Sequence, residues 1–559
     1  MMPPEEKPLL SLKTVSFWIV LFLLLANLPY LAAWLFPPEN KQFVGTLINA
    51  DDLSTYLSAI RQGAGGNWLY HFQYSPEPWQ PKLMLLPYLL TGKLAGFIGG
   101  APLLWFHLIR IASICFTLAV FIFWVRTIFP QQPRVQTTSW LLLLFGSGLG
   151  WLVAILQGPG LPGPLIADVN VPEWSIFMAL FHTPHFALGL GLETLLFGSV
   201  IRLFATEHLR EKLVWVIVAA GVGLASGLTY VYHLPITAVV IAVFSLWQVT
   251  RRHENLWRDL LLSGIVLLPL GLLLLYYAVF ANQDPYFAYY ARYEHVIHPP
   301  RPLAVVVGAG LLGILAVMAI PRWLKQGKTL LLPLWLGLNL VLLYVPIVPY
   351  TGRFGLGVMV PIVTLAGWYL EDTVLPWLAR RPFYTPFSRF TTTPYASLRR
   401  VWFAAFLPST LLIPLLLTKT AVSAQDFPVY MANQEVEAAA WLAQHSDADD
   451  LILAAYPLGN YLPRAISGKL FLGQLDFTTD LDDKLRLLEQ FWAEETTLAW
   501  REAFLQEWGI DIIYAGQYEQ GFIQQPVELP AEIIFRNETV TIYRVTTKAP
   551  SATSPSTGT

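Results

Sequence analysis

The sequence predicts a polytopic α-helical membrane protein with a small C-terminal α/β domain on the outer side of the membrane. Of its 559 residues, 55% are hydrophobic and only 13% are charged, whereas a soluble domain carries about twice that share of charge. Apolar runs recur between Thr14 and Thr420, and many are long enough to cross roughly 30 Å of hydrocarbon. Beyond residue 423 the composition becomes that of a water-soluble domain.

Twelve apolar segments are candidate spans. They cover residues 14–38, 83–100, 103–125, 135–156, 182–204, 213–231, 233–249, 260–281, 303–320, 330–348, 354–375 and 401–417. The first segment is longer than a signal-peptide core, so we expect it to be retained as a span.

Basic loops orient these segments, because short cytoplasmic loops are enriched in Lys and Arg. Four such loops alternate with the spans, at residues 202–212, 251–258, 322–328 and 380–400. This alternation places on the outer side the turn 230–233, the loops 282–301 and 348–353, and all residues after 418. Both span counts given below leave the loop 39–82 on the outer side as well.

An inner N-terminus and an outer C-terminus require an odd number of crossings, so twelve spans cannot all be right. If segment 83–100, which Lys93 and several glycines interrupt, is a helix on the outer surface, eleven spans remain. Alternatively this segment crosses, and a thirteenth span lies between residues 157 and 204. The predicted protein therefore has about 11 to 13 transmembrane helices.

Composition divides the chain into three parts: a membrane domain (1–420) with a large first outer loop (39–82), an outer domain (421–545) and a disordered tail (546–559). The spacing of apolar residues within the outer domain predicts α/β structure. We expect a helix at 434–445, one or two helices at 482–507, strands at 451–455 and 511–515, and a hairpin of 532–536 with 540–545.

Several function classes are excluded by what the sequence lacks. A net charge of −2 gives no concentrated basic face, so nucleic acid is not a predicted partner. Cys115 is the only cysteine, which rules out an intrachain disulfide and a thiolate metal cluster. The sequence contains no Walker A loop, dinucleotide fingerprint or HExxH motif.

The first outer loop, INADDLSTYLSAIRQGAGGNWLYHFQYSPEPWQPKLMLLPYLL, is the most informative stretch. Asp51 and Asp52 lie near the membrane surface, and Tyr56 and Arg61 follow at spacings that share one side of a short helix. A carboxylate here could take a proton from an incoming hydroxyl or hold a divalent cation such as Mg or Mn. Alternatively, the Asp pair caps a helix that begins at Leu53.

This loop resembles that of the GT-C class of glycosyltransferases, in particular the protein O-mannosyltransferase and lipid A aminoarabinose transferase branch. The resemblance rests on the acidic pair, the Tyr, the Arg, the Gly-rich turn and the Pro/aromatic segment within 49–88. It implies inverting transfer of a hexose or pentose from a polyprenyl-phosphate carrier. The acceptor would be a lipid, glycan or protein at the outer face of the plasma membrane, in the cell envelope.

The same resemblance implies roles for acidic residues. The general base falls on Asp51, with Asp52 as the second choice. A second acidic position in a later outer loop often assists in this class, and the candidates are Asp168 and Glu173 in LPGPLIADVNVPEWS. Whether a metal ion takes part is left open.

Candidate ligands for the donor phosphate or sugar follow from the predicted topology. Arg353 lies beside Tyr350 at an outer turn with two glycines, which suits a phosphate, although an interfacial anchor is the alternative. The further candidates are Arg61 and Tyr56 of the first loop, His182 and His185 at a span entrance, and Arg292 and His295 in an aromatic loop. Glu193 lies inside a span, where an ionisable group is expected to be paired or functional.

A lipid or small-solute transporter is the main alternative, and a noncatalytic scaffold is another. Transporters often carry ionisable groups near the middle of the membrane. Here the polar residues gather in the predicted outer loops, and the spans hold few charges beyond Glu193. This distribution favours an enzyme that works at the membrane interface.

Overall fold

The computed structural model describes residues 10–157, 166–252, 255–294, 297–389, 395–522 and 527–546. Within these residues the chain forms two compact units. Unit 1 comprises 10–29, 107–280 and 297–419, and unit 2 comprises 30–106, 281–294 and 420–546. The first loop and the C-terminal segment thus belong to the same unit. The predicted disordered tail lies outside the described residues, except for Thr546.

Unit 1 is built from helices, and its division from unit 2 falls within α1 and α4. Its long helices are α1 (Leu12–Leu35), α4 (Pro102–Ile128), α5 (Pro133–Phe145), α9 (Pro184–Ala205), α10 (Leu209–Thr229), α11 (Leu234–Arg252), α12 (Leu256–Leu275), α14 (Pro302–Lys325), α15 (Leu331–Tyr344), α16 (Met359–Tyr369), α19 (Ala396–Phe406) and α20 (Pro408–Ser423). Its short elements include α6 (Gly150–Gln157), α7 (Ala167–Asn170), η1 (Pro172–Trp174), α8 (Ile176–His182), η2 (Val231–His233), η6 (Thr351–Gly355), η7 (Leu370–Val374), α17 (Leu375–Ala379) and α18 (Tyr384–Ser388).

The helices confirm a multi-pass membrane protein. Within the described ranges, nine helical stretches are long and apolar enough to cross a membrane, or ten if α19 and α20, which meet at a 42° bend, form one span. Helix α3 (Leu86–Ile98) has 13 residues, which rise only about 20 Å. This length agrees with the surface-helix alternative for segment 83–100. Helix α15 is also shorter than the span predicted at 330–348.

In unit 2, the first loop pairs with the chain that follows the last membrane helix. Strand β1 (Lys41–Phe43) is antiparallel to β2 (Tyr430–Ala432), with Gln42 opposite Met431. The rest of the loop contains α2 (Ala50–Ala64) and leads into α3, and α13 (Pro285–Tyr289) belongs to the same unit.

The C-terminal part of unit 2 is a five-stranded sheet with the strand order β4-β3-β5-β7-β6. Its strands are β3 (Leu451–Leu453), β4 (Lys469–Leu470), β5 (Ile512–Ala515), β6 (Ala531–Arg536) and β7 (Thr541–Val545). Strand β3 is parallel to β4 and β5, whereas β7 is antiparallel to β5 and β6. These strands confirm the predicted strands and the predicted hairpin.

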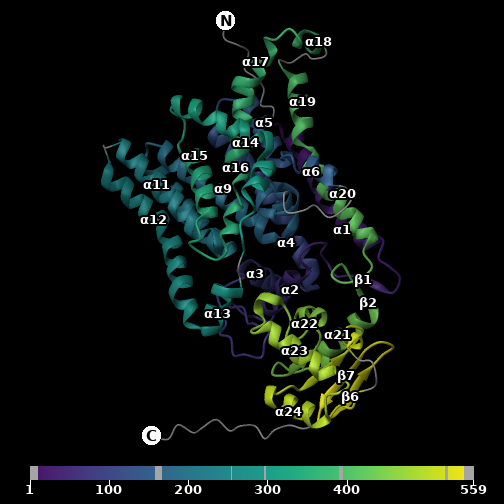
Figure 1. Ribbon diagram of the computed structural model, residues 1–559. Coiled ribbons are helices and arrows are strands. Elements are labelled where there is room, and N and C mark those ends of the chain that lie inside the picture. Colours follow the sequence, from purple (N-terminus) through teal and green to yellow (C-terminus); the bar gives the residue numbers. More distant parts are fainter. Residues whose placement is uncertain are drawn as a thin grey trace. The chain divides into compact units, whose positions relative to one another are not determined.

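Helices cover both faces of this sheet, as expected when side chains alternate along buried strands. The helices are α21 (Asn433–His445), α22 (Tyr456–Tyr461), α23 (Leu481–Trp492) and α24 (Leu498–Trp508). Ile452 of β3 packs with α21 and α22. Its neighbours Leu451 and Leu453 pack with α23 and α24 on the opposite face. Figure 1 shows these helices around the strands. The segment 482–507, predicted to form one or two helices, forms the two helices α23 and α24.

Close contact between α2 and α3 depends on glycines. A Cβ on Gly92 of α3 would lie 2.0 Å from the carbonyl oxygen of Ile60 in α2, and one on Gly63 would lie 2.1 Å from the oxygen of Leu89. No side chain fits at such distances, so the two backbones touch directly. Helix α2 carries the predicted acidic pair, and this packing fixes its place in unit 2.

We expect Gly92→Ala to separate α2 from α3 and to lower the stability of the full chain in detergent by about 2 kcal/mol or more, because overpacking a tight contact is costly. Thermal unfolding measures this loss. Gly221→Ala in α10 is the matched control, since nothing lies within 4 Å of its added Cβ and alanine favours a helix. Equal melting temperatures for the two variants would contradict this packing.

Candidate functional site

Arg353 forms the centre of a buried cluster in unit 1. Its Nη1 donates to Oε1 of Glu173 at 2.5 Å, and the Arg and Glu side chains are 19% and 4% exposed. Arg353 lies in η6 and Glu173 in η1, 180 residues apart. Gly355 allows this approach, because a Cβ there would lie 2.7 Å from Nε1 of Trp174. Two separately predicted site residues therefore meet as an ion pair.

Aromatic rings surround the guanidinium of Arg353. Its central carbon lies 5.5 Å from the ring centre of Phe186 and 5.7 Å from that of Tyr232. The ring of Tyr350 lies 5.1 Å from that of Tyr232. A guanidinium over ring faces is stabilised by cation–π attraction and keeps its charge away from bulk water. Tyr350, predicted as a donor contact, thus belongs to the same cluster.

The two predicted histidines lie beside the same rings. The ring centres of His182 and His185 are 5.2 and 4.8 Å from that of Phe186, and His185 Nδ1 is 3.1 Å from Oγ1 of Thr183. Burial, reinforced by the charge of Arg353, lowers the pKa of His182 to about 3. His182 is therefore neutral at physiological pH and contributes a polar ring without charge.

Several buried polar atoms around Arg353 have no hydrogen-bond partner among the described residues. They are Nε of Arg353, Nε1 of Trp174, the hydroxyl of Tyr230 and Nδ1 of His182. Buried donors in proteins are almost always paired, because an unpaired one costs about 1–3 kcal/mol. Three of these atoms carry a hydrogen to donate, which suits a ligand rich in acceptor oxygens.

The partner of Glu193, which sequence patterns did not reveal, is His233. Nδ1 of His233 is 3.1 Å from Oε1 of Glu193, and the same oxygen accepts from the hydroxyl of Thr237 at 3.0 Å. Nε2 of His233 is 2.8 Å from the carbonyl oxygen of Arg353. Arg353 therefore forms an ion pair with Glu173 through its side chain and a hydrogen bond with His233 through its backbone carbonyl.

Asp168, the other acidic candidate of unit 1, binds backbone instead of Arg353. Its Oδ2 accepts from the amides of Gly148 and Gly150 at 3.0 and 3.3 Å. These glycines lie at the junction of α5 and α6, where the apolar segment predicted as one span at 135–156 is broken. The backbone groups freed by the break thus find a buried acceptor.

In unit 2, Asp51 and Asp52 lie in the first turn of α2, which begins at Ala50. Burial raises the pKa of Asp51, the nearby hydroxyl of Tyr456 lowers it, and the charge of Asp476 raises it further. Oδ1 of Asp52 accepts from Nε2 of Gln474 at 3.4 Å. Helix α2 begins at Ala50, whereas the capping alternative assumed a helix that begins three residues later, at Leu53.

The two side chains that act on the pKa of Asp51 come from the C-terminal part of unit 2. Tyr456 begins α22 directly after β3, and Asp476 lies in η9 (Leu475–Phe477). The acidic pair thus adjoins the carboxyl end of a parallel strand, where α/β sheets commonly place functional groups. Sequence analysis missed Tyr456, because over 400 positions separate it from Asp51 and no spacing rule links them.

The other first-loop candidates make packing contacts within unit 2. Arg61 donates from Nε to the carbonyl of Pro463 at 3.3 Å, from Nη1 to Ser467 at 3.0 Å and from Nη2 to Gln73 at 2.8 Å. The Tyr56 ring stacks on that of Tyr88, with centres 4.5 Å apart.

Of the two candidates in the aromatic loop, only Arg292 lies among the described residues. Arg292 lies exposed in η5 (Tyr290–Glu294), and His295 lies outside the described residues. The described part of the chain holds no group of three or more His, Cys, Asp or Glu residues placed to bind a metal ion.

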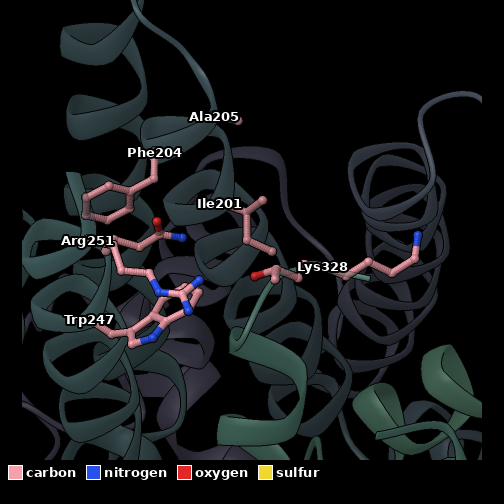
Figure 2. Close-up of a pocket in the computed structure, with 9 residues that line it drawn as sticks. Ile201, Phe204, Ala205, Trp247, Arg251 and Lys328 are labelled. Atoms are coloured by element: carbon pink, nitrogen blue, oxygen red, sulfur yellow. The ribbon is translucent and has the colours of Figure 1, made fainter. Parts of the chain in front are cut away.

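A cavity of about 350 Å³ lies in unit 1 between the C-terminal ends of α9 and α11 and the turn 327–329. Arg251 lies over the ring of Trp247, 4.7 Å from its centre, whereas Lys328 points away from the cavity (Figure 2). The 22 residues of α9 rise about 33 Å. The cavity therefore lies at the opposite end of α9 from His185 and the Arg353 cluster.

Solved structures share this fold at low sequence identity. An oligosaccharyltransferase of Archaeoglobus fulgidus, crystallised with a tethered acceptor peptide, gives a TM-score of 0.55 at 10% identity over 90% of this chain and 69% of its own. AglB of the same organism, in complex with an inhibitory peptide and a dolichol-phosphate, gives 0.52 at 9% identity over 90% and 70%.

A third structure matches over nearly the full length of both chains. ArnT from Cupriavidus metallidurans in its apo state gives a TM-score of 0.50 at 15% identity, over 95% of this chain and 98% of its own. AglB and ArnT are GT-C glycosyltransferases, which confirms the predicted resemblance at the level of the fold. No protein-family model and no curated protein matches the sequence.

We expect Asp168→Asn to remove a pH dependence of stability. Burial raises the pKa of Asp168 from its ordinary 3.8 to about 6. A raised pKa means that the folded state holds the proton more tightly than the unfolded state. The resulting stability is present below pH 4 and is lost as the pH rises through about 6.

Between pH 4 and pH 8, the unfolding free energy of the wild type should fall on the order of 3 kcal/mol further than that of Asp168→Asn. Thermal unfolding of both proteins in detergent across this range measures it. The asparagine keeps an acceptor for Gly148 and Gly150, so both proteins should fold. Melting temperatures that change in parallel with pH would show that Asp168 does not titrate in this window.

Proposed function

We propose that the protein is a membrane glycosyltransferase that moves a sugar from a polyprenyl-phosphate donor to an acceptor. The Arg353 cluster carries the proposal: a buried guanidinium is surrounded by buried donors that lack partners in the described structure. A phosphate has several acceptor oxygens and a negative charge, so it complements both features. Two proteins of similar fold support this assignment: AglB was solved in complex with a dolichol-phosphate, and the oligosaccharyltransferase of Archaeoglobus fulgidus was solved with a tethered acceptor peptide.

Arg353 stabilises the leaving phosphate in this mechanism. When the bond between the anomeric carbon and the phosphate oxygen breaks, its electron pair goes to the phosphate, which gains negative charge. A guanidinium in a partly dry site stabilises that charge more strongly than water does. Glu173 holds Arg353 in the absence of donor, and its carboxylate occupies a place that a phosphate oxygen would take.

Asp51 is the proposed general base. The acceptor hydroxyl attacks the anomeric carbon and transfers its proton to Asp51, and a single displacement inverts the anomeric configuration. Burial raises the pKa of Asp51, which makes its carboxylate a stronger proton acceptor than an exposed aspartate. Asp52, beside it in the same turn, is the alternative base.

The C-terminal part of unit 2 is proposed to be extracytoplasmic. The alternation of basic loops supports this orientation.

Asp51→Asn should lower transfer by a factor of about 10² to 10⁴, because asparagine cannot accept the proton. The measurement is release of label from a panel of radiolabelled polyprenyl-phosphate sugars, with membrane extract as the acceptor source. Asp52→Asn is assayed in parallel to decide between the two carboxylates. Asp482→Asn, an exposed change in the same unit, is the matched control and should keep full activity.

Full transfer by both Asp51→Asn and Asp52→Asn would contradict the proposed base. No transfer by the wild-type protein from any donor of the panel would count against the glycosyltransferase and favour a transporter.

A further inference from the structure

Glu193 lies in α9, within a candidate span, and its side chain is 2% exposed. An ionisable group in such a place is costly unless another group compensates its charge. His233, 3% exposed, supplies that group from the end of η2, directly before α11. The pair therefore joins two helices of unit 1 through buried polar atoms.

The contacts of His233 fix where its protons lie. Nε2 faces the carbonyl oxygen of Arg353, which can only accept, so Nε2 carries a hydrogen. Nδ1 faces Oε1 of Glu193, so a second proton lies between these two atoms. Whichever atom holds that proton, Glu193 and His233 together are neutral. They can therefore stay buried behind Arg353 without opposing an anion bound there.

The backbone of the Arg353 turn rests on this pair. Nε2 of His233 donates to the carbonyl of Arg353 at 2.8 Å, and Nδ2 of Asn339 donates to that of Phe354, also at 2.8 Å. Gly357 has a φ of 83°, and a Cβ there would lie 2.6 Å from Oε2 of Glu193. Only glycine lets the chain after η6 pass so close to the carboxylate.

We propose that Glu193 and His233 act as a positioning pair, which holds the η6 backbone so that Arg353 presents its guanidinium to the donor phosphate. This inference rests on the proposed function and assigns the pair to the same site. Neither side chain touches the reacting atoms. Both act through the carbonyl of Arg353, so their loss should weaken phosphate binding and leave the base in unit 2 unchanged.

A variant that keeps the hydrogen bonds of the pair, compared with variants that remove them, distinguishes a positioning role from an effect of the Glu193 charge. In Glu193→Gln the side-chain amide can donate to Nδ1 of His233, which leaves the hydrogen on Nε2 for the Arg353 carbonyl. This variant should keep the donor KM within about threefold of wild type. Glu193→Ala and His233→Ala remove the support and should raise the donor KM about tenfold, the equivalent of one hydrogen bond. His208→Ala, an exposed histidine of unit 1, is the matched control.

The experiment measures KM and kcat for the labelled donor, together with binding of a C55 polyprenyl phosphate to each purified variant in nanodiscs. A tenfold weaker affinity in His233→Ala and Glu193→Ala, with near-normal affinity in Glu193→Gln, supports the positioning pair. Unchanged affinity in the alanine variants overturns it. Equal losses in Glu193→Gln and Glu193→Ala also overturn it, because the charge would then matter more than the hydrogen bonds.

Two further results separate this inference from the proposed function. If the wild type binds polyprenyl phosphate but transfers no sugar, the proposed function fails, and the order of affinities still decides the role of the pair. If the wild type binds no polyprenyl phosphate, both fail. Should an alanine variant not fold, Thr237→Val removes one hydrogen bond to Glu193 and should weaken binding in the same direction by about threefold.

Discussion

The ion pair between Arg353 and Glu173 joins η6 to η1 across 180 positions of the chain. A buried guanidinium is costly without a counter-charge, so its neighbours must compensate it. Glu173 supplies the charge, Phe186 and Tyr232 supply ring faces, and His233 holds the backbone. In the proposed function, a phosphate binds the buried donors that have no partner among the described residues. The arrangement of this end of unit 1 thus follows from the requirements of one buried cation.

Much of the fold was predictable, because the membrane and the sheet both impose simple periodicities. Hydrophobic length identified the helical stretches that can cross a membrane, although α3 and α15 are shorter than the spans predicted there. Residue patterns of the C-terminal domain identified the hairpin of β6 and β7 and the strands β3 and β5. The site was partly predictable as well. Arg353, Tyr350, His182 and His185 were named from local chemistry at predicted span ends, whereas Glu173 was named from the family resemblance.

Pairings between distant segments were not predictable. Nothing in the local sequence links Glu193 to His233 or Asp51 to Tyr456, because these contacts depend on helix packing and on the return of the chain after the last span. The break between α5 and α6 was missed for the same reason: its freed amides are satisfied by Asp168, which lies on another element. Arg61 was named as a donor ligand from its place in the first loop, and that role stays a prediction. Its hydrogen bonds join this loop to the C-terminal segment, a contact that was not predicted.

The central claim is that Arg353 is the phosphate ligand, and binding of a C55 polyprenyl phosphate to the full chain in nanodiscs tests it most directly. Arg353→Gln should weaken binding at least tenfold, because the charge-assisted hydrogen bonds are lost. Glu173→Gln should bind as tightly as wild type or more tightly, because a competing carboxylate charge is removed. Unchanged affinity in Arg353→Gln, with the variant still folded, would contradict the account.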